Sequence, residues 1–385
     1  MSQAQFRAIS FPYICFVKKL LPKPEEHTTL IIFLAKMLKL PARGDEPLSN
    51  KHIGKQSVAL PKPPSIAGHA CVVGKKEGEG PLRDSFDLIN EDSFFGEKTW
   101  EKAESIMQKT TLGLALSKAK LSPSEVEYVF AGDLLNQCIG STFGLRDMDI
   151  PFWGLYGACS TMSEGLALAA MSIDGGFADT TAAITSSHFC SAERQFRFPL
   201  EYGGQRPPTA QWTVTGAGAV VLTAEGEGPY ITHVTCGKII DQGIKDANNM
   251  GAAMAPAAYD TLRAHFEDLA VEPGHYDLIV TGDLGAVGSE ILVDFFRNDG
   301  IDIAPNYNDC GLMIFTRDMQ DVHAGGSGCG CAAAVLTGYL LNGMRAGRWK
   351  RILFAATGAL MSPVSTQQGE SIPGICYTVS ISSTR

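Results

Sequence analysis

The sequence predicts an α/β protein made of two related halves, each built around a mainly parallel sheet. Residues 128–134 (YVFAGDL) and 278–284 (LIVTGDL) share one pattern and start 150 residues apart (278 − 128). In both halves a helix-like segment precedes this run, and a Gly-rich turn, a small-residue helix and another apolar run follow it. That succession is typical of βαβ units. With 385 residues, the chain is also longer than a single core usually supports.

The first half begins with a helix-like segment at residues 110–120, which a Leu-Ser-Pro-Ser turn ends. The continuous apolar run at 128–134 predicts a buried strand. Gly157 then opens the turn GACST, which leads into a helix rich in small residues, and residues 181–185 predict the next strand. Small side chains allow close approach of neighbouring elements, so we expect this helix to be buried.

The second half repeats these elements. Residues 257–269 predict a helix that ends at a Val-Glu-Pro-Gly turn, and 278–284 predict the strand after it. A Gly-Cys-Gly-Cys turn opens a helix at 332–343, and 351–357 predict another strand. The offset between the halves grows from 150 to about 172 (331 − 159 = 172), which indicates different insertions. The predicted divisions are an N-terminal extension at 1–50, a first half at 51–225 and a second half at 226–385.

The extension at residues 1–50 has two short apolar patches, 11–21 and 29–40, separated by prolines. Each is shorter than the roughly 20 apolar residues that span a bilayer. We favour a segment outside the folded part, poorly ordered or upstream of the true start. The alternative is an amphipathic segment that contacts a membrane, because lysines lie beside its apolar residues. Without a secretory signal peptide, a cytoplasmic location is expected.

Composition excludes several classes of protein. The net charge of −9, without a Lys/Arg run, argues against nucleic-acid binding. Ten cysteines show no C-x-x-C spacing, and the C-x-C at Cys329 and Cys331 is not typical of zinc, so no metal site and reduced thiols are expected. The Gly-rich run at 325–330 lacks the Gly-Lys-Ser/Thr ending of a phosphate-binding loop, which argues against a nucleotide site there.

Several motifs resemble known families. The turn GACST at 157–161 resembles the nucleophile motif of the thiolase and ketoacyl-synthase superfamily. Longer runs, spread over about residues 51–380, resemble the stage V sporulation protein AD family; these are AGDLLNQ (131–137), SSH (186–188), AERQFR (192–197), EYGGQ (201–205), MGAAMAPAA (250–258), NDCGLM (308–313) and GGSGC (325–329).

The resemblance implies a thiolase-like fold of two pseudo-symmetric halves in layered αβαβα order. It also implies a protein of endospore formers that binds dipicolinic acid for uptake into the developing spore, with calcium arriving as its chelate and no cofactor of its own. The implied partners are membrane proteins of the same uptake system, which would hold the chain at the spore inner membrane. Relatives with this fold usually pair, so a homodimer is expected.

Cys159 is the first candidate for a functional residue. A thiol at a helix N-terminus faces unpaired N–H groups and the positive end of the helix dipole, which predicts a lowered pKa. The same groups attract a ligand carboxylate. The turn therefore suits either an acyl-enzyme nucleophile or an anion-binding pocket.

Condensing enzymes also need a base near the thiol, usually histidine. In the second half Asp283 stands where the superfamily pattern suggests that base, and an ionised Asp cannot donate to an oxyanion. His323 is a candidate for a replacement imidazole. His188, at the end of a predicted strand, is the better candidate for a ligand pocket, because ligands gather at strand ends in α/β sheets.

A ligand with two carboxylates calls for donors, and guanidinium groups bind carboxylates in a bidentate manner. Arg194 and Arg197 lie three residues apart and would share one face of a helix. If the ligand arrives as a calcium chelate, the oxygens of Asp283, Asn308 and Asp309 become useful; Asn308 and Asp309 are equally explained by a turn.

Three functions stay open on the sequence alone. The favoured one is a binding protein for dipicolinate without catalytic turnover. The second is an acyltransferase or condensing enzyme that uses Cys159 as its nucleophile. The third is a scaffold whose pocket is vestigial, since one fold hosts many functions.

Overall fold

The computed structural model describes residues 51–196 and 205–385. The expectations for residues 1–50 and for Arg197 therefore lie outside the described residues. Residues 51–385 form one compact unit.

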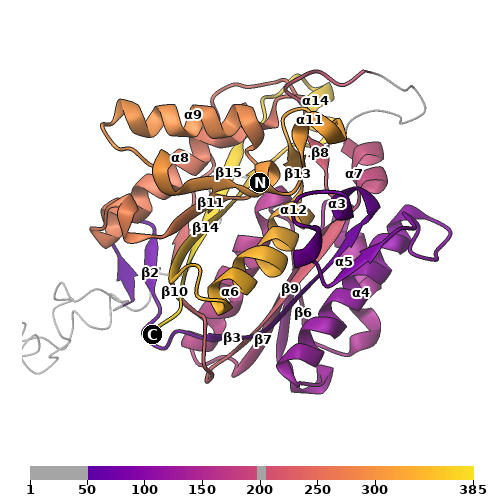
Figure 1. The fold of residues 1–385 in the computed structure, drawn as a ribbon, viewed down its shortest axis with the longest axis vertical. Coiled ribbons are helices and arrows are strands. Elements are labelled where there is room, and N and C mark those ends of the chain that lie inside the picture. Colours follow the sequence, from indigo (N-terminus) through magenta and orange to yellow (C-terminus); the bar gives the residue numbers. More distant parts are fainter. Residues whose placement is uncertain (1–50, 197–204) are drawn as a thin grey trace, which may run out of the picture. The chain divides into compact units, whose positions relative to one another are not determined.

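One mixed sheet runs through the described part of the chain, and its two five-stranded parts have the same topology (Figure 1). Counted outward from the centre, the order is β3-β9-β7-β5-β6 in the first half and β10-β15-β14-β11-β12 in the second. The parts meet through one antiparallel pair, Ser65 with Tyr230. The strands are β3 (Ser65–Gly74), β5 (Tyr128–Gly132), β6 (Phe152–Leu155), β7 (Thr180–Ser187), β9 (Gly216–Thr223), β10 (Tyr230–Cys236), β11 (Leu278–Thr281), β12 (Tyr307–Asp309), β14 (Arg351–Ala359) and β15 (Gly374–Ser382).

Strand direction follows the same rule in both halves. The outer three strands of each part are parallel, as the βαβ pattern predicts. The inner strands β9 and β15 each pair antiparallel with both of their neighbours, so each half is mixed rather than mainly parallel. The sequence prediction missed β9 and β15 because it followed only the matching motifs.

The predicted helices are longer than expected at their N-termini. The first is α4 (Trp100–Ala119) and the second is α8 (Met250–Leu269), again 150 residues apart at both ends. The Thr99 hydroxyl caps α4 by accepting from the backbone N–H of Lys102, and the Asn249 side chain caps α8 in the same way. Both helices stop at a residue in the left-handed conformation, Lys120 or Ala270.

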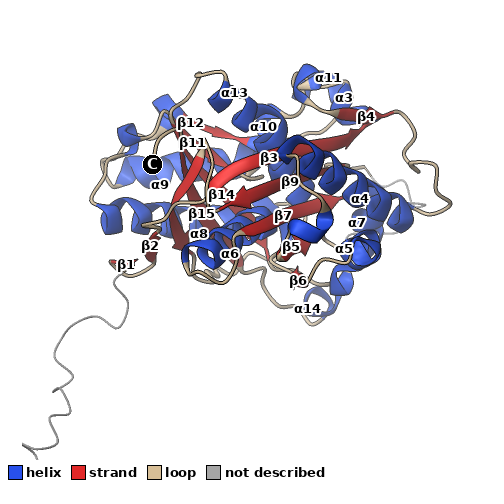
Figure 2. Ribbon diagram, turned by 90° about the horizontal axis from the view of Figure 1, so that it is seen from below, coloured by secondary structure: helices blue, strands red, loops and turns tan. Residues whose placement is uncertain are grey.

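The helices form three layers around the two parts of the sheet (Figures 1 and 2). The outer layers are α4 and α5 on the first half, and α8 and α9 on the second. The middle layer is α6 with the continuous helix α12–η9–α13, and α6 contacts strands of both halves. Their bounds are α5 (Ile139–Leu145), α6 (Thr161–Asp174), α9 (Gly285–Asn298), α12 (Cys329–Ala334), the π-helix η9 (Val335–Leu340) and α13 (Leu341–Arg345).

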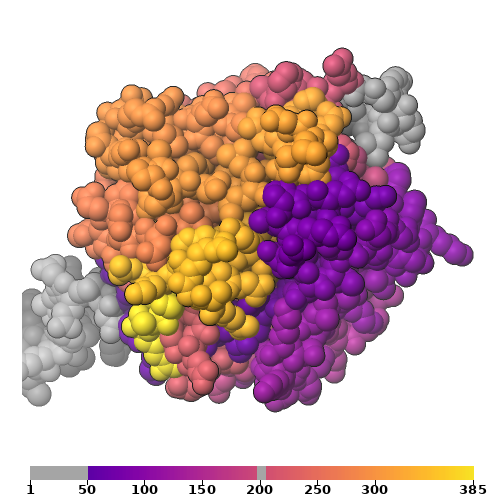
Figure 3. All heavy atoms as spheres, in the orientation of Figure 1, coloured from indigo at the N-terminus to yellow at the C-terminus, as the bar shows by residue number. Residues whose placement is uncertain are grey.

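This arrangement confirms the layered αβαβα fold, and the small-residue helices are buried as predicted. Ala167, Ala169 and Ala170 of α6 and all six residues of α12 have almost no exposed surface. On the face shown in Figure 3, first-half residues (indigo to magenta) and second-half residues (orange to yellow) occupy separate areas.

The smaller elements connect the main ones. The hairpin of β1 (His52–Ile53) and β2 (Ser57–Ala59) pairs with β10 of the second half, and the Asp268 carboxylate accepts three of its backbone N–H groups. The remaining elements are α3 (Lys75–Gly78), β4 (Leu88–Asn90), α7 (Phe189–Phe196), β8 (Trp212–Thr213), α10 (Cys310–Met313), α11 (Arg317–Gln320), β13 (Gly326–Ser327) and α14 (Pro363–Gln367). None of the helices in the described ranges has the length and apolar character needed to cross a membrane.

Candidate functional site at Cys159

Cys159 lies in a strained turn just before the central helix α6. Ala158 adopts a left-handed backbone conformation (φ 52°), which is uncommon for a residue with a Cβ. The Thr161 hydroxyl accepts from the Gly157 N–H (3.2 Å) and donates to the Ala158 carbonyl (2.6 Å), so it holds both sides of the turn. Strain of this kind persists where surrounding structure enforces it, and it often marks a functional site.

The second half of the chain contributes Asp283, which the structure places beside Cys159. The two side chains are hydrogen-bonded to each other. The Asp283 carboxylate also accepts from the Ser327 hydroxyl (3.0 Å), the Gly328 N–H (2.8 Å) and the Thr357 hydroxyl (3.0 Å). These donors come from the loop before α12 and from β14. The duplication thus brings the Gly-Asp end of one half to the Cys turn of the other.

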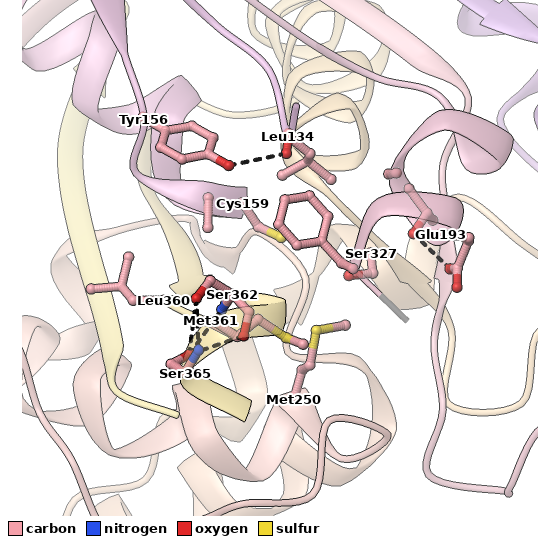
Figure 4. Close-up of a pocket in the computed structure, with 15 residues that line it drawn as sticks. Leu134, Tyr156, Cys159, Glu193, Met250, Ser327, Leu360, Met361, Ser362 and Ser365 are labelled. Atoms are coloured by element: carbon pink, nitrogen blue, oxygen red, sulfur yellow. Dashed lines mark hydrogen bonds between the residues drawn. The ribbon is translucent and has the colours of Figure 1, made fainter. Parts of the chain in front are cut away.

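A cavity of about 370 Å³ opens above this cluster (Figure 4). It is lined by Leu134, Tyr156, Ala158, Cys159, Ala192, Glu193, Phe196, Thr213, Met250, Ser327, Ala359, Leu360, Met361, Ser362 and Ser365. Most of these side chains are apolar, and the hydroxyls are few, which is the usual make-up of a small-molecule site. Glu193 is the one charged side chain among these described residues, and the Thr213 hydroxyl donates to its carboxylate (2.9 Å).

Burial sets the chemistry of the thiol. It raises the pKa of Cys159 well above the ordinary range, and the neighbouring Asp283 raises it further. Burial also raises the pKa of Asp283, against hydrogen bonds from Cys159 and the other donors. The sequence had predicted a lowered pKa for Cys159, which is the opposite direction. That prediction considered the helix N-terminus but not the loss of water or the adjacent carboxyl group. Near neutral pH the thiol is therefore protonated and a weak nucleophile.

Asp309 and Asn308 lie outside the cavity lining. The buried carboxylate of Asp309 accepts from the Thr281 hydroxyl and from the N–H groups of Leu284 and Gly285, so it stabilises the turn that presents Asp283. The side-chain oxygen of Asn308 accepts from the N–H of Asp309 (2.8 Å), and the residue is exposed. The Asp309 carboxylate and the Asn308 side-chain oxygen are thus already hydrogen-bonded within the protein.

Neither predicted histidine lines the cavity. His188 is buried at the end of β7, where its Nδ1 accepts from the Cys190 N–H and its Nε2 donates to the Ser93 carbonyl (2.8 Å). Burial lowers the pKa of His188 and keeps the ring neutral. The Nε2 of His323 lies 3.5 Å from the carboxylate of Asp321, away from the cavity lining. The cavity lining in the described residues therefore contains no imidazole to act as a base for Cys159.

Arg194 is also away from the cavity, although it lies on α7 with three of the lining residues. Its guanidinium forms an ion pair with Glu101 and lies over the ring of Trp100, and half of its side chain is exposed. The predicted partner, Arg197, lies outside the described residues.

Sequence reasoning missed several lining residues. Three of them lie inside the motifs given above, but nothing in the sequence distinguishes them from their neighbours; they are Ser327, Glu193 and Met250. Ser362 and Ser365 had no signal at all, because the loop that carries them reaches the cavity only through the tertiary fold. In the described ranges, no group of three or more His, Cys, Asp or Glu side chains is arranged to hold a metal ion.

Comparison with known proteins agrees with the sequence motifs. A family model described as stage V sporulation protein AD matches residues 54–382. The chain is 45% identical over 329 residues to the stage V sporulation protein AD of Bacillus subtilis (strain 168), a match that covers 86% of this chain and 97% of that protein.

Solved structures of low identity show the same fold. A variant of OleA from Xanthomonas campestris has a TM-score of 0.55 at 15% identity, covering 88% of this chain and 99% of that one. The 3-oxoacyl-[acyl-carrier-protein] synthase III of Aquifex aeolicus VF5 has a TM-score of 0.50 at 14% identity, covering 83% and 99%. These similarities confirm the thiolase-like fold class and say nothing about activity.

Proposed function

Because the chain belongs to the stage V sporulation protein AD family, we propose that it binds dipicolinic acid in the Cys159 cavity and does not catalyse acyl transfer. The observation that carries the proposal is the cavity itself, with apolar walls and hydroxyl groups, over a protonated thiol. The family resemblance supplies the identity of the ligand.

The cavity suits a flat aromatic ring with polar substituents. Tyr156 and Phe196 offer aromatic surface, and Met250 and Met361 offer adaptable sulfur-containing side chains. The hydroxyl protons of Thr213 and Ser327 are already donated to Glu193 and Asp283. The hydroxyls of Ser362 and Ser365, which bond within their own turn, would donate to a ligand carboxylate by exchanging those local hydrogen bonds.

Charge bears on the form of the ligand. The Asp283 carboxyl lies beneath the cavity, so the carboxylates of a free dianion would be repelled by it whenever it is ionised. Calcium bound to the ligand would offset this repulsion. We therefore propose that the calcium chelate is accepted at least as well as free dipicolinate, with calcium arriving as part of the ligand rather than as a resident metal.

Calorimetric titration with dipicolinate, with and without calcium, tests the proposal. We expect saturable binding by the wild type, weakened about tenfold by Cys159→Ala, because that change removes a thiol contact and leaves Asp283 short of a donor. The matched control is Cys71→Ala, a buried cysteine on β3 that does not line the cavity. A pyridine dicarboxylate with its carboxylates at positions 3 and 5 tests recognition of shape. Absence of heat in both conditions, or equal weakening by both variants, would contradict the proposal.

The alternative is acyl transfer by Cys159. The strained turn at Ala158 favours it, since it presents the thiol to the cavity. The raised pKa of Cys159 and a cavity lining without histidine among the described residues oppose it. Incubation with acyl thioesters followed by mass spectrometry separates the two functions: a stable acyl adduct on Cys159 would favour the enzyme, and an unmodified thiol would favour binding.

For the location of the protein, we propose a peripheral place at the spore inner membrane through the membrane proteins of the same uptake system. The family resemblance is the support for this partner. Co-purification from spore membranes, followed by release in high salt or alkaline buffer without detergent, is the result expected of a peripheral protein. A requirement for detergent would contradict it.

A further inference from the structure

A chain of buried polar side chains runs behind the cavity, between α4 and the loop after β5. Glu104 on α4 accepts from the Ser186 hydroxyl (2.8 Å), and Asp133 accepts from the Ser141 hydroxyl (2.6 Å). The Gln108 amide nitrogen is within 2.8 Å of both hydroxyl oxygens and so connects the two carboxyl groups. All five residues are buried.

Each carboxyl group holds one wall of the cavity. Asp133 accepts from the N–H of Leu135, and thereby sets the loop in which Leu134 lines the cavity. Glu104 accepts from the Ser191 hydroxyl (2.9 Å) near the start of α7, the helix whose Ala192, Glu193 and Phe196 line another part of the cavity. Two segments of the lining that are distant in the sequence are therefore hydrogen-bonded to one polar network.

The donors show which carboxyl group keeps a proton. Asp133 accepts from backbone N–H groups and a hydroxyl, which favour the ionised form. The donors to Glu104 are two serine hydroxyls. Burial, and after it the charge of Asp133, raises the pKa of Glu104 to about 8. Burial raises the pKa of Asp133 as well, but its larger set of donors favours the ionised form, so Glu104 is the carboxyl that keeps a proton at neutral pH.

The described groups that interact electrostatically with the two carboxyls include Glu101 on α4, Cys138 and Tyr156 near Asp133, and Cys329 on α12, and none of these four is basic. Of these, Glu101 is itself paired with Arg194 at the surface. Loss of the proton would place two negative charges in a buried site, which costs free energy unless the network opens.

The second half provides an internal comparison. The offset of 150 residues that relates α4 to α8 and Asp133 to Asp283 places Met254 where Glu104 stands (254 − 104). Met254 is fully buried and apolar, and the buried carboxyl that interacts with Asp283 is that of Asp309 on β12, not one on the helix. The fold therefore does not require a carboxyl group at this position of the helix. The presence of the Glu104 carboxyl in the first half is therefore explained by something other than the fold.

We propose that Glu104 and Asp133 are positioning residues for the Cys159 cavity: with Glu104 protonated, Ser186, Gln108 and Ser141 join both carboxyls in one network, which holds the Leu134 loop and α7 against the ligand. This inference rests on the proposed function of the cavity. Ligand affinity should then fall as the pH rises through the range in which Glu104 loses its proton, because the second charge loosens both walls.

The experiment is dipicolinate titration from pH 6.5 to pH 9.5 on the full chain, with Glu104→Gln as the test variant. Glutamine keeps the size and an oxygen acceptor but cannot ionise. We expect wild-type affinity to fall at least fivefold over this range and the affinity of Glu104→Gln to stay within twofold. The matched control is Glu77→Gln, a buried carboxyl away from the cavity whose pKa burial raises to about 7, which should keep the wild-type profile.

A second measurement needs no ligand. Hydrogen exchange at the N–H groups of Leu135 and Ser141, which donate to Asp133, should speed up with pH beyond the intrinsic rate in the wild type and not in Glu104→Gln. If dipicolinate does not bind at any pH, the proposed function fails, while this exchange result still supports or overturns the positioning pair. A wild-type affinity that is flat with pH, or identical profiles for wild type and Glu104→Gln, would overturn it.

Discussion

Cys159 illustrates how burial outweighs a helix end in setting the pKa of a thiol. The backbone N–H groups at the start of α6 favour thiolate, but loss of water and the Asp283 carboxyl favour the protonated form more strongly. The same residue type in the same kind of turn therefore serves as a contact for a ligand rather than as a nucleophile in the function proposed here.

Removing the charge at position 283 should make the thiol more reactive. Asp283→Asn takes away a negative neighbour, so the pKa of Cys159 should fall and its alkylation by iodoacetamide at pH 8 should become severalfold faster. The rate is measured by mass spectrometry on the peptide that carries Cys159. The exposed Cys236 in the same protein is the internal control, and its rate should not change. An unchanged or slower rate at Cys159 would show that Asp283 does not suppress the thiolate.

At the scale of elements, the Cys159 turn depends on close contact with β14. A Cβ added at Gly358 would lie 2.5 Å from the Gly157 carbonyl oxygen, which is too close for any side chain. Because both groups are backbone, neither can move away without shifting the turn or the strand.

We therefore expect Gly358→Ala to destabilise the protein by about 1–3 kcal/mol, the usual cost of overpacking. Urea unfolding measures the change. The matched control is Gly113→Ala on the exposed side of α4, where the new Cβ meets no atom within 4 Å. That substitution should stabilise the helix by roughly 0.5–1 kcal/mol, because alanine is the better helix former. Equal effects at the two positions would mean that the close contact between Gly358 and the Gly157 carbonyl is not the cause.

At the scale of the whole molecule, the two ends of the sheet differ although the halves share one topology. The end strand β6 exposes Phe152 and Trp153, and the neighbouring Phe143 and Tyr156 are about half exposed. The equivalent end strand β12 exposes Asn308 instead. An end strand with exposed aromatic side chains is open to pairing with another chain.

This asymmetry favours the expected homodimer, with a second copy paired along β6. We expect the wild type to sediment as a dimer at micromolar concentration and Phe152→Glu to sediment as a monomer with unchanged circular dichroism. Phe177→Glu, at an exposed aromatic residue after α6, should stay dimeric. A monomeric wild type, or a dimeric Phe152→Glu, would rule this interface out.

The internal duplication explains why so much of the fold was predictable. Buried parallel strands and proline-terminated helices leave local patterns, and those of α4 and β5 recur 150 residues later in α8 and β11. The same patterns singled out Cys159 in the turn of the first half and Asp283 at a strand end of the second. The antiparallel strands β9 and β15 were missed. They lie outside the matching motifs, and an apolar run by itself does not show whether a strand is parallel or antiparallel to its neighbours.

The sequence by itself thus determined the duplicated α/β architecture, the family and the two residues at the centre of the candidate site. Only the tertiary structure decided which other side chains line the cavity, that His188, Arg194 and His323 lie elsewhere, and that Cys159 is protonated. It alone revealed the network of Glu104 and Asp133. The physical reason is that periodicity and capping are local, whereas burial, hydrogen-bond partners and the electrostatic surroundings of a group depend on residues that are distant in the chain.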